Sequence, residues 1–261
     1  MFLMVGMMGI DLNCDMGESF GNYEIGMDEK VMDYVTSANL ACGYHAGDPN
    51  VMAERVRMAK EKNVEVGAHP GYPDLMGFGR REMDVSSDEL KNYITYQIGA
   101  LNGFLKQHGM NLQHVKPHGA LYNSTANDED LGKAIVSAIL DFDDDVILVG
   151  LSGSKILEIA DEMGLKSAAE VFADRAYNSD KTLVSRKRDG AVIHDEEVVE
   201  KRVIKMVEDE AVESIDGEEI SIVADTVCVH GDNPEAVALT RNLKESLEED
   251  GITVESMNEY I

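Results

Sequence analysis

Three segments of the sequence each place a histidine beside glycine or proline at the point where an apolar run stops. They are VGAHPGYPD, VKPHGALYN and CVHGDNPEA, which contain His69, His118 and His230. Histidines and carboxylates together can bind a divalent metal with one position open for water, or can act without metal as an acid and base pair. In VKPHGALYN, Lys116 precedes the histidine by two residues. It could stabilise a developing oxyanion, or act as a base if burial removes its proton.

Other residues able to do chemistry lie in or just after similar apolar runs. The complete polar set is Asp11, Asn13, Asp15, Asn39, His45, His69, Lys116, His118, Asp174, Arg175, His230 and Asp232. Chemistry of this kind requires the elements of the fold to bring these distant residues together.

Strand-like and helix-like segments alternate along the chain, in an order typical of parallel strands joined by helical crossovers. We predict strands at residues 10–15, 37–43, 64–69, 114–118, 146–150, 168–174 and 220–230. The predicted helices are 28–35, 49–62, 88–108, 128–140, 153–163, 196–212 and 234–249. Because no linker or low-complexity tract divides the chain, we expect a single domain over residues 1–261.

Most predicted strands are apolar on one face and polar on the other. In DLNCD, for example, Leu12 and Cys14 alternate with Asp11, Asn13 and Asp15. An open parallel sheet is covered by helices on both faces, where unpaired charge would be costly to bury. A closed barrel can instead direct the polar face into its lumen, and the chemistry of such barrels lies at the carboxyl ends of the strands. We therefore predict an α/β fold, a (β/α) barrel of about seven parallel strands.

Composition limits the partners and the compartment. The net charge of −27, from 50 acidic and 23 basic residues, would repel nucleic acid and anionic membranes, so we expect neither as a partner. The apolar start MFLMVGMMG is too short to span a bilayer and follows no basic residue, so we expect no signal peptide. Cys14, Cys42 and Cys228 form no CxxC pair and fit a reducing compartment. We expect a cytoplasmic protein.

Six segments resemble the motifs of the LamB/YcsF family. They are DLNCDMGESFGNYEIGMDE, ANLACGYHAGDP, GAHPGYPDLMGFGRR, VKPHGALYN, EVFADRAY and CVHGDNP, which occur in this order over nearly the whole chain. The resemblance implies a seven-stranded barrel similar to the glycoside hydrolase and deacetylase barrels. Members of the family are described as the A subunit of 5-oxoprolinase. The resemblance thus implies ATP-dependent opening of 5-oxoproline (pyroglutamate) to L-glutamate, together with two partners, the B and C subunits.

The family blocks and the polar pattern together suggest roles for individual residues. We expect catalytic roles for Asp15, His69, Lys116, His118 and His230. We expect substrate-binding roles for Asp11, Asn13, His45, Asn123, Asp174, Arg175 and Asp232. The related deacetylases use an Asp-His-His metal site, but DLNCD lacks their Asp-Asp pair, so metal binding stays open. If a metal is bound, the candidate ligands are Asp15, His45, His69 and His118.

The segment GLSGSK is too short for a Walker A loop, which has four residues between its first glycine and its final Gly-Lys pair. We therefore expect ATP, with Mg²⁺, to be handled together with the partner subunits. The basic segment VSRKRDG is either a solvated turn or a loop in which Arg186 contacts an anion. Two other functions stay open, a stand-alone metal-dependent deacetylase or amidohydrolase and a non-catalytic, lactam-binding regulatory subunit. The general base and the number of copies, including a homo-oligomer, also stay open.

Overall fold

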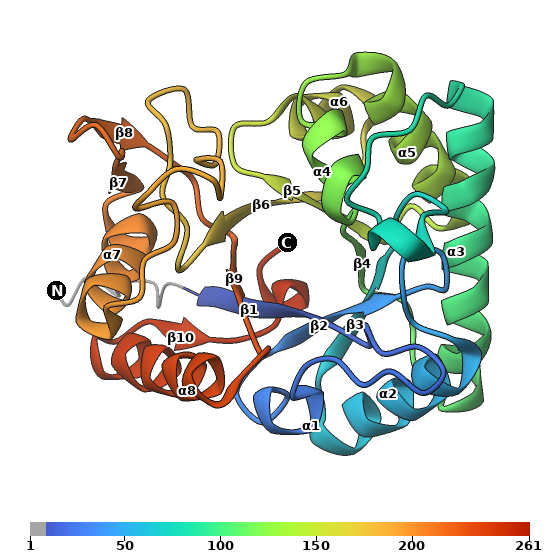
Figure 1. Cartoon of the computed structure of the whole chain (residues 1–261), viewed down its shortest axis with the longest axis horizontal. Helices are drawn as coiled ribbons and strands as arrows, with labels where there is room; N and C mark the ends of the chain where they lie inside the picture. Colours follow the sequence, from blue (N-terminus) through green and yellow to red (C-terminus); the bar gives the residue numbers. More distant parts are fainter. Residues whose placement is uncertain (1–8) are drawn as a thin grey trace, which may run out of the picture.

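Seven parallel strands close into a barrel in the computed structural model, which describes residues 9–261 (Figure 1). Strand β1 pairs with both β2 and β9, so the ring has no free edge. The predicted (β/α) barrel is confirmed; the apolar start falls, apart from Gly9, outside the described residues. The ring consists of β1 (Gly9–Met16), β2 (Ser37–Ala41), β3 (Glu65–His69), β4 (His114–Val115), β5 (Ile147–Leu151), β6 (Ser167–Phe172) and β9 (Thr226–Val229).

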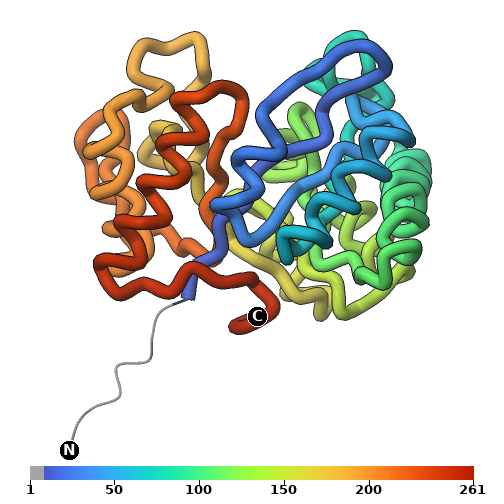
Figure 2. Tube along the Cα trace, turned by 90° about the horizontal axis from the view of Figure 1, so that it is seen from below, coloured from blue at the N-terminus to red at the C-terminus, as the bar shows by residue number. Residues whose placement is uncertain are grey.

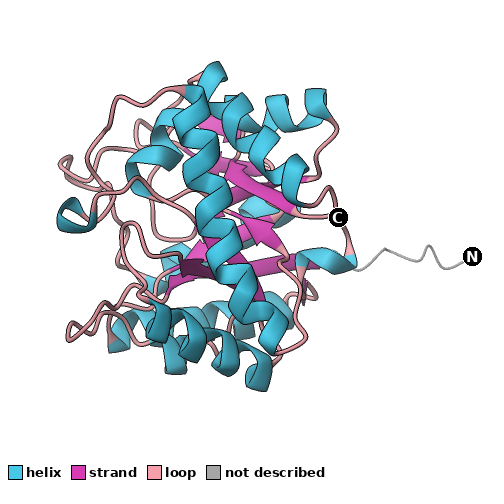
Figure 3. Ribbon diagram, turned by 90° about the vertical axis from the view of Figure 1, so that its right-hand side faces the viewer, coloured by secondary structure: helices cyan, strands magenta, loops and turns pink. Residues whose placement is uncertain are grey.

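Helices surround the ring and cover the apolar face of its strands (Figures 1 and 3). Leu12, Val66 and Val115 belong to this apolar layer and are fully buried in the main core. None of the helices within residues 9–261 has the length and apolar character needed to cross a membrane. The helices are α1 (Asp28–Val31), α2 (Pro49–Lys62), α3 (Ser87–Gln107), α4 (Gly119–Thr125), α5 (Glu129–Phe142), α6 (Lys155–Met163), α7 (Glu196–Glu208) and α8 (Pro234–Glu249).

The predictions for residues 196–212 and 220–230 were wrong in part. Helix α7 ends at Glu208, and β7 (Ala211–Glu213) pairs antiparallel with β8 (Glu219–Ser221) in a separate hairpin. Only β9 joins the barrel from the predicted strand. The turn contains Asp216 and Gly217, and Gly217 has a φ of 84°. An Asp-Gly pair between two short strands is a strong hairpin signal. Predicted helix 28–35 is shorter than expected, and α4 was not predicted.

The end of the barrel at which the strands begin is closed by the C-terminal segment, which crosses it in Figure 2. Strand β10 (Thr253–Val254) pairs with β1, and the short 3₁₀ helix η2 (Met257–Glu259) follows it. Met257 is fully buried and packs with Ile147, Val149 and Ala168. This end of the lumen is therefore a packed floor, and access from solvent is left to the opposite end.

Above this floor, Asp11 is completely buried and held by three hydroxyl groups. Its Oδ1 accepts hydrogen bonds of 2.6 Å from both Thr36 and Ser37, and its Oδ2 accepts one from Thr226. Burial raises the pKa of Asp11 to about 6, although the three hydroxyl groups lower it. Asp11 was predicted to bind substrate, but the structure places it just above the floor of the lumen, outside the residues that line the cavity.

The raised pKa of Asp11 predicts a measurable pH dependence of stability. Between pH of about 4 and 6 the folded protein keeps a proton that the unfolded chain has released. The free energy of unfolding contributed by this group therefore falls as pH rises, by at most about 1.4 kcal/mol per pH unit. Asp11→Asn removes this component. In denaturant unfolding, the free energy of unfolding of the variant relative to that of the wild type should therefore increase from pH 4 to 7. Parallel profiles of the two proteins would contradict the assignment.

Candidate active site

A cavity of ≈ 480 Å³ opens at the carboxyl end of the strands. It brings together residues that are far apart in the sequence, because the strands of the barrel all end at this rim. All five residues predicted to be catalytic line it, as do two of those predicted to bind substrate. The polar lining includes Asp15, His69, Arg80, Lys116, His118, Tyr122, Asn123, Arg175, Arg186 and His230.

Lys116 lies at the base of the cavity and is almost fully buried. Its Nζ is 2.9 Å from Asp15 Oδ1, 2.7 Å from Glu170 Oε1 and 3.2 Å from Asn13 Oδ1. Burial opposes the charge of Lys116, but the carboxylates of Asp15 and Glu170 outweigh burial and hold its pKa well above the usual value. Lys116 is therefore held as a cation between these carboxylates, which favours an electrostatic role over the role of a base.

Glu170 was missed by sequence analysis, although it is the second anion on Lys116. It is completely buried on β6, and Tyr122 donates a hydrogen bond of 2.6 Å to its Oε2. The available signal was a glutamate within the apolar run SAAEVF, in the same phase as Phe172 and Asp174. A charge at such a position has to be paired if it is buried.

The two carboxylate oxygens of Asp15 differ in their hydrogen bonding. Oδ1 accepts hydrogen bonds from Lys116 and from Asn39 Nδ2 at 2.8 Å, whereas Oδ2 is 3.4 Å from His69 Nε2. Burial would raise the pKa of Asp15, but the charges of His69 and Lys116 outweigh it and hold the pKa well below the usual value. Asp15 is thus an ionised carboxylate with a fixed orientation at the mouth of the cavity.

His230 and Asp174 form a histidine–carboxylate pair on the rim. His230 Nδ1 is 2.9 Å from Asp174 Oδ2. Burial alone would lower the pKa of His230, but the hydrogen bond and charge of Asp174 raise it above its usual value. The carboxylate fixes the ring so that its other nitrogen is the one available for proton transfer. His230 also lines an adjoining cavity of ≈ 280 Å³, together with Asp232.

Arginines border the cavity on the side of the loop that follows β6. Arg175 is buried, and it donates to the main-chain oxygens of Ala191 at 3.3 Å and Val184 at 2.7 Å. Arg186 is exposed and lines both cavities, as Arg175 does. In a chain with a net charge of −27, this pair gives the cavity a local site for an anionic group.

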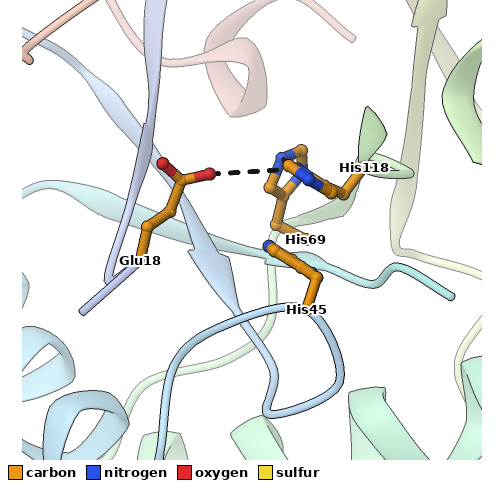
Figure 4. Close-up of side chains that lie close together, drawn as sticks. All are labelled: Glu18, His45, His69 and His118. Carbon is orange, nitrogen blue, oxygen red and sulfur yellow. Dashed lines mark hydrogen bonds and ion pairs between the residues drawn. The ribbon is translucent and has the colours of Figure 1, made fainter. Parts of the chain in front are cut away.

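Four side chains at the rim lie close enough to share one metal ion. Glu18, His45, His69 and His118 each offer a ligand atom, and these atoms all lie within 4.8 Å of one another. Figure 4 shows the carboxylate and the three rings pointing toward one another from separate segments of the chain, with His69 at the end of β3. Asp15 was a predicted ligand, but the close group contains Glu18 in its place.

A sequence model of the LamB/YcsF family matches residues 10–261. The chain belongs to the LamB/YcsF family. The A subunit of a 5-oxoprolinase from Thermococcus sibiricus is 63% identical over 97% of this chain and 100% of that protein. The corresponding protein from Campylobacter jejuni is 53% identical over 98% of this chain and 100% of its own length.

Solved structures agree with this membership in the LamB/YcsF family. The lactam utilization protein of Thermus thermophilus superposes with a TM-score of 0.91 at 45% identity, over 95% of this chain and 99% of that one. A family 4 carbohydrate esterase from Streptomyces lividans gives a TM-score of 0.50 at 10% identity, over 95% and 91%. The second likeness shows that the barrel fold is shared.

Some polar residues of the LamB/YcsF motifs do not reach the cavity. Asn13 is buried in the lumen, where its Oδ1 accepts from Asn39 Nδ2 at 2.7 Å as well as from Lys116. His45 is buried behind the ring of His118, and Asp232 is exposed at the adjoining cavity. Arg80 was not predicted but lines the cavity, and its signal was the basic end of GFGRR.

Proposed function

We propose that this chain is the A subunit of an ATP-dependent 5-oxoprolinase. With its partners, the B and C subunits, it opens the lactam ring of 5-oxoproline to give L-glutamate. One observation carries the proposal: the ≈ 480 Å³ cavity joins an oriented carboxylate, a proton-transferring histidine and arginines for an anion. Relatives that are A subunits of 5-oxoprolinase match nearly the whole chain, which supports the same reaction.

The chemistry explains why ATP is needed. Amide resonance makes the lactam carbonyl a poor electrophile and its nitrogen a poor leaving group. Transfer of the terminal phosphoryl group of ATP to the lactam oxygen gives an imidate-like phosphate and ADP. Water then adds to the former carbonyl carbon of the lactam, and the bond between this carbon and the ring nitrogen breaks as the nitrogen takes a proton. A second water cleaves the resulting acyl phosphate, so that glutamate and phosphate leave. ATP, with Mg²⁺, is handled at the partners or at an interface with them.

The side chains of the cavity suit the hydrolytic half of this sequence. Asp15 takes the proton of the attacking water, and the His230 ring gives a proton to the departing nitrogen. The Nζ of Lys116 contacts oxygens of three side chains, so we assign it to holding Asp15 in place. Arg175 and Arg186 face the carboxylate of 5-oxoproline or the phosphate of its activated form.

Arg186→Gln is expected to weaken the use of 5-oxoproline without disturbing the fold. The side chain is exposed, so its loss removes one charge-assisted contact with the substrate anion. We expect KM for 5-oxoproline to rise about tenfold, with kcat much less affected, in steady-state assays of the assembled complex. Arg188→Gln is the matched control, because Arg188 pairs with Asp216 away from the cavity. Equal KM values for both variants would argue against an anion site at Arg186.

The proposed division of labour is tested by reconstitution. The purified chain should release no glutamate from 5-oxoproline and ATP, whereas the chain mixed with both partners should release glutamate, ADP and phosphate in equal amounts. Full turnover by the chain alone would contradict the role of the partners. Release of acetate from an N-acetylated substrate, sensitive to a chelator, would instead support the deacetylase alternative.

A further inference from the structure

The two histidines at the centre of the rim have their tautomers set by main-chain oxygens. His69 Nδ1 is 2.7 Å from the carbonyl oxygen of Lys116, and His118 Nε2 is 2.8 Å from that of Phe78. A carbonyl oxygen only accepts hydrogen bonds, so both of these nitrogens carry the ring hydrogen. The remaining nitrogens, His69 Nε2 and His118 Nδ1, face each other at 2.9 Å. In the neutral rings these are two lone pairs, which repel unless a positive species lies between or beside them.

His45 adds a third ring whose polar atoms are not satisfied. Its side chain is completely buried, and neither ring nitrogen has a hydrogen-bond partner within the described part of the chain. The ring stacks on His118 with centroids 3.7 Å apart and planes 2° from parallel. A buried nitrogen without a partner is destabilising, and a ligand to that nitrogen would remove this penalty.

Glu18 completes the group with a carboxylate. Its Oε1 is 3.9 Å from His118 Nδ1, the contact drawn as a dashed line in Figure 4. Burial, with the charges of Asp15 and Asp232, raises the pKa of Glu18 to about 8. Burial, with the nearby His69, lowers the pKa of His118 to about 3. The group thus places one carboxylate beside three histidine rings, with all four ligand atoms close together.

We propose that Glu18, His45, His69 and His118 form a binding site for one divalent transition metal ion, and that Zn²⁺ fits it. Three imidazoles and one carboxylate are donors that suit Zn²⁺. Ligand atoms about 2.0–2.1 Å from a metal lie about 2.9–3.4 Å apart at coordination angles of about 90–110°. The 2.9 Å between the two facing nitrogens falls within this range, whereas Glu18 Oε1, 3.9 Å from His118 Nδ1, has to move closer on metal binding. The carbonyl oxygens behind His69 and His118 are partners of the kind that orient metal-bound histidines.

The backbone around the rings leaves room for them only because two neighbouring residues are glycines. A Cβ atom at Gly71 would lie 2.8 Å from His45 Nδ1, and one at Gly79 would lie 2.8 Å from both His45 and His118. Gly79 also has a φ of 62°, which disfavours other residues. The close packing of the rings is therefore built into the loops that follow β2 and β3.

This site differs from the predicted ligand set and from the Asp-His-His site of the deacetylases. The Asp15 carboxylate is already engaged by Lys116 and Asn39, and Glu18 lies where the fourth ligand would be. The metal would stand beside Asp15, where a bound ion lowers the pKa of a coordinated water. Metal binding itself is independent of the lactam reaction, so either conclusion can fail without the other.

Calorimetric titration of the chelator-treated chain with Zn²⁺ tests the site directly. We expect one equivalent to bind to the wild type, and Glu18→Gln and His45→Asn each to weaken binding at least about tenfold. Co²⁺ gives a second readout, because its visible absorption reports nitrogen and oxygen ligands without any assay of turnover. Thermal unfolding of the metal-free variants checks that they are folded.

Two controls separate this site from other acidic groups. Glu82→Gln changes a glutamate that lines the same cavity but lies outside the group, and it should bind Zn²⁺ like the wild type. The triple variant Asp143→Asn, Asp144→Asn and Asp145→Asn removes the exposed acidic cluster, and it should also leave binding unchanged. The proposal is overturned if the wild type binds no Zn²⁺, if the triple variant abolishes binding, or if Glu18→Gln and His45→Asn both bind like the wild type. In that case the two facing nitrogens share a proton.

Discussion

Replacing Lys116 with methionine is expected to lower the free energy of unfolding by about 3–5 kcal/mol, because the change leaves buried carboxylates without their cation. Glu170 is completely buried, and its Oε1 is 2.7 Å from the lysine nitrogen. Asp15 loses the same partner at 2.9 Å. Methionine is similar in length, so loss of charge pairing outweighs loss of packing. Denaturant unfolding at neutral pH measures the effect.

Two control variants show whether charge pairing is the cause. Adding Glu170→Gln to Lys116→Met removes one of the two carboxylate charges that have lost their cation. The double variant should therefore recover part of the lost free energy of unfolding. Lys133→Met breaks an exposed pair with Glu129 and should change the free energy of unfolding by less than about 1 kcal/mol. If Lys116→Met lowers the free energy of unfolding no more than Lys133→Met does, pairing of Lys116 with the buried carboxylates does not stabilise the barrel.

His230→Ala is expected to reduce turnover of 5-oxoproline by the assembled complex about 10²–10⁴-fold, the usual contribution of a positioned acid. The ring lines the cavity and is aligned by Asp174 at 2.9 Å. His194→Ala is the matched control, because His194 is exposed and lines only the adjoining cavity. Normal turnover by His230→Ala would instead favour a regulatory role for this chain, with catalysis on a partner.

Asp174→Asn separates the orienting role of Asp174 from a purely structural one. Asp174 keeps the pKa of His230 above its usual value, and an acid acts only while it is protonated. Activity should therefore fall as pH rises through that pKa in the wild type, and should fall at lower pH in Asp174→Asn. An unshifted pH profile would show that Asp174 does not tune His230.

The barrel could be predicted because apolar and polar residues alternate along most of its strands. In DLNCD, two residues face the helices and the three polar ones face the lumen, a pattern that an open sheet would not tolerate. The same alternation placed Asp15, Lys116 and His230 at one rim, and they line one cavity. Alternation can be read within a single segment. It therefore predicts whether a side chain faces the lumen or the helices without any knowledge of the other segments.

The remaining features depend on contacts between segments, which periodicity does not report. Glu18 follows β1 in a loop, and only the positions of three other segments bring it within reach of the histidines. The sequence alone does not explain why Glu170 lies in an apolar strand. The explanation is its contact with Lys116, which comes from a different segment of the chain. Asp11 follows the same alternation as Asp15, but it lies nearer the floor, where it accepts hydrogen bonds from Thr36, Ser37 and Thr226. Depth along the lumen is not encoded in the alternation.

The central claim is that the cavity at the strand ends binds the lactam substrate, and a crystal structure of the protein with 5-oxoproline tests it most directly. We expect the ligand in the ≈ 480 Å³ cavity, with its ring carbonyl near Asp15 and His230 and its carboxylate against Arg175 or Arg186. A cavity without ligand at saturating 5-oxoproline, or a ligand bound outside the barrel mouth, would contradict this claim.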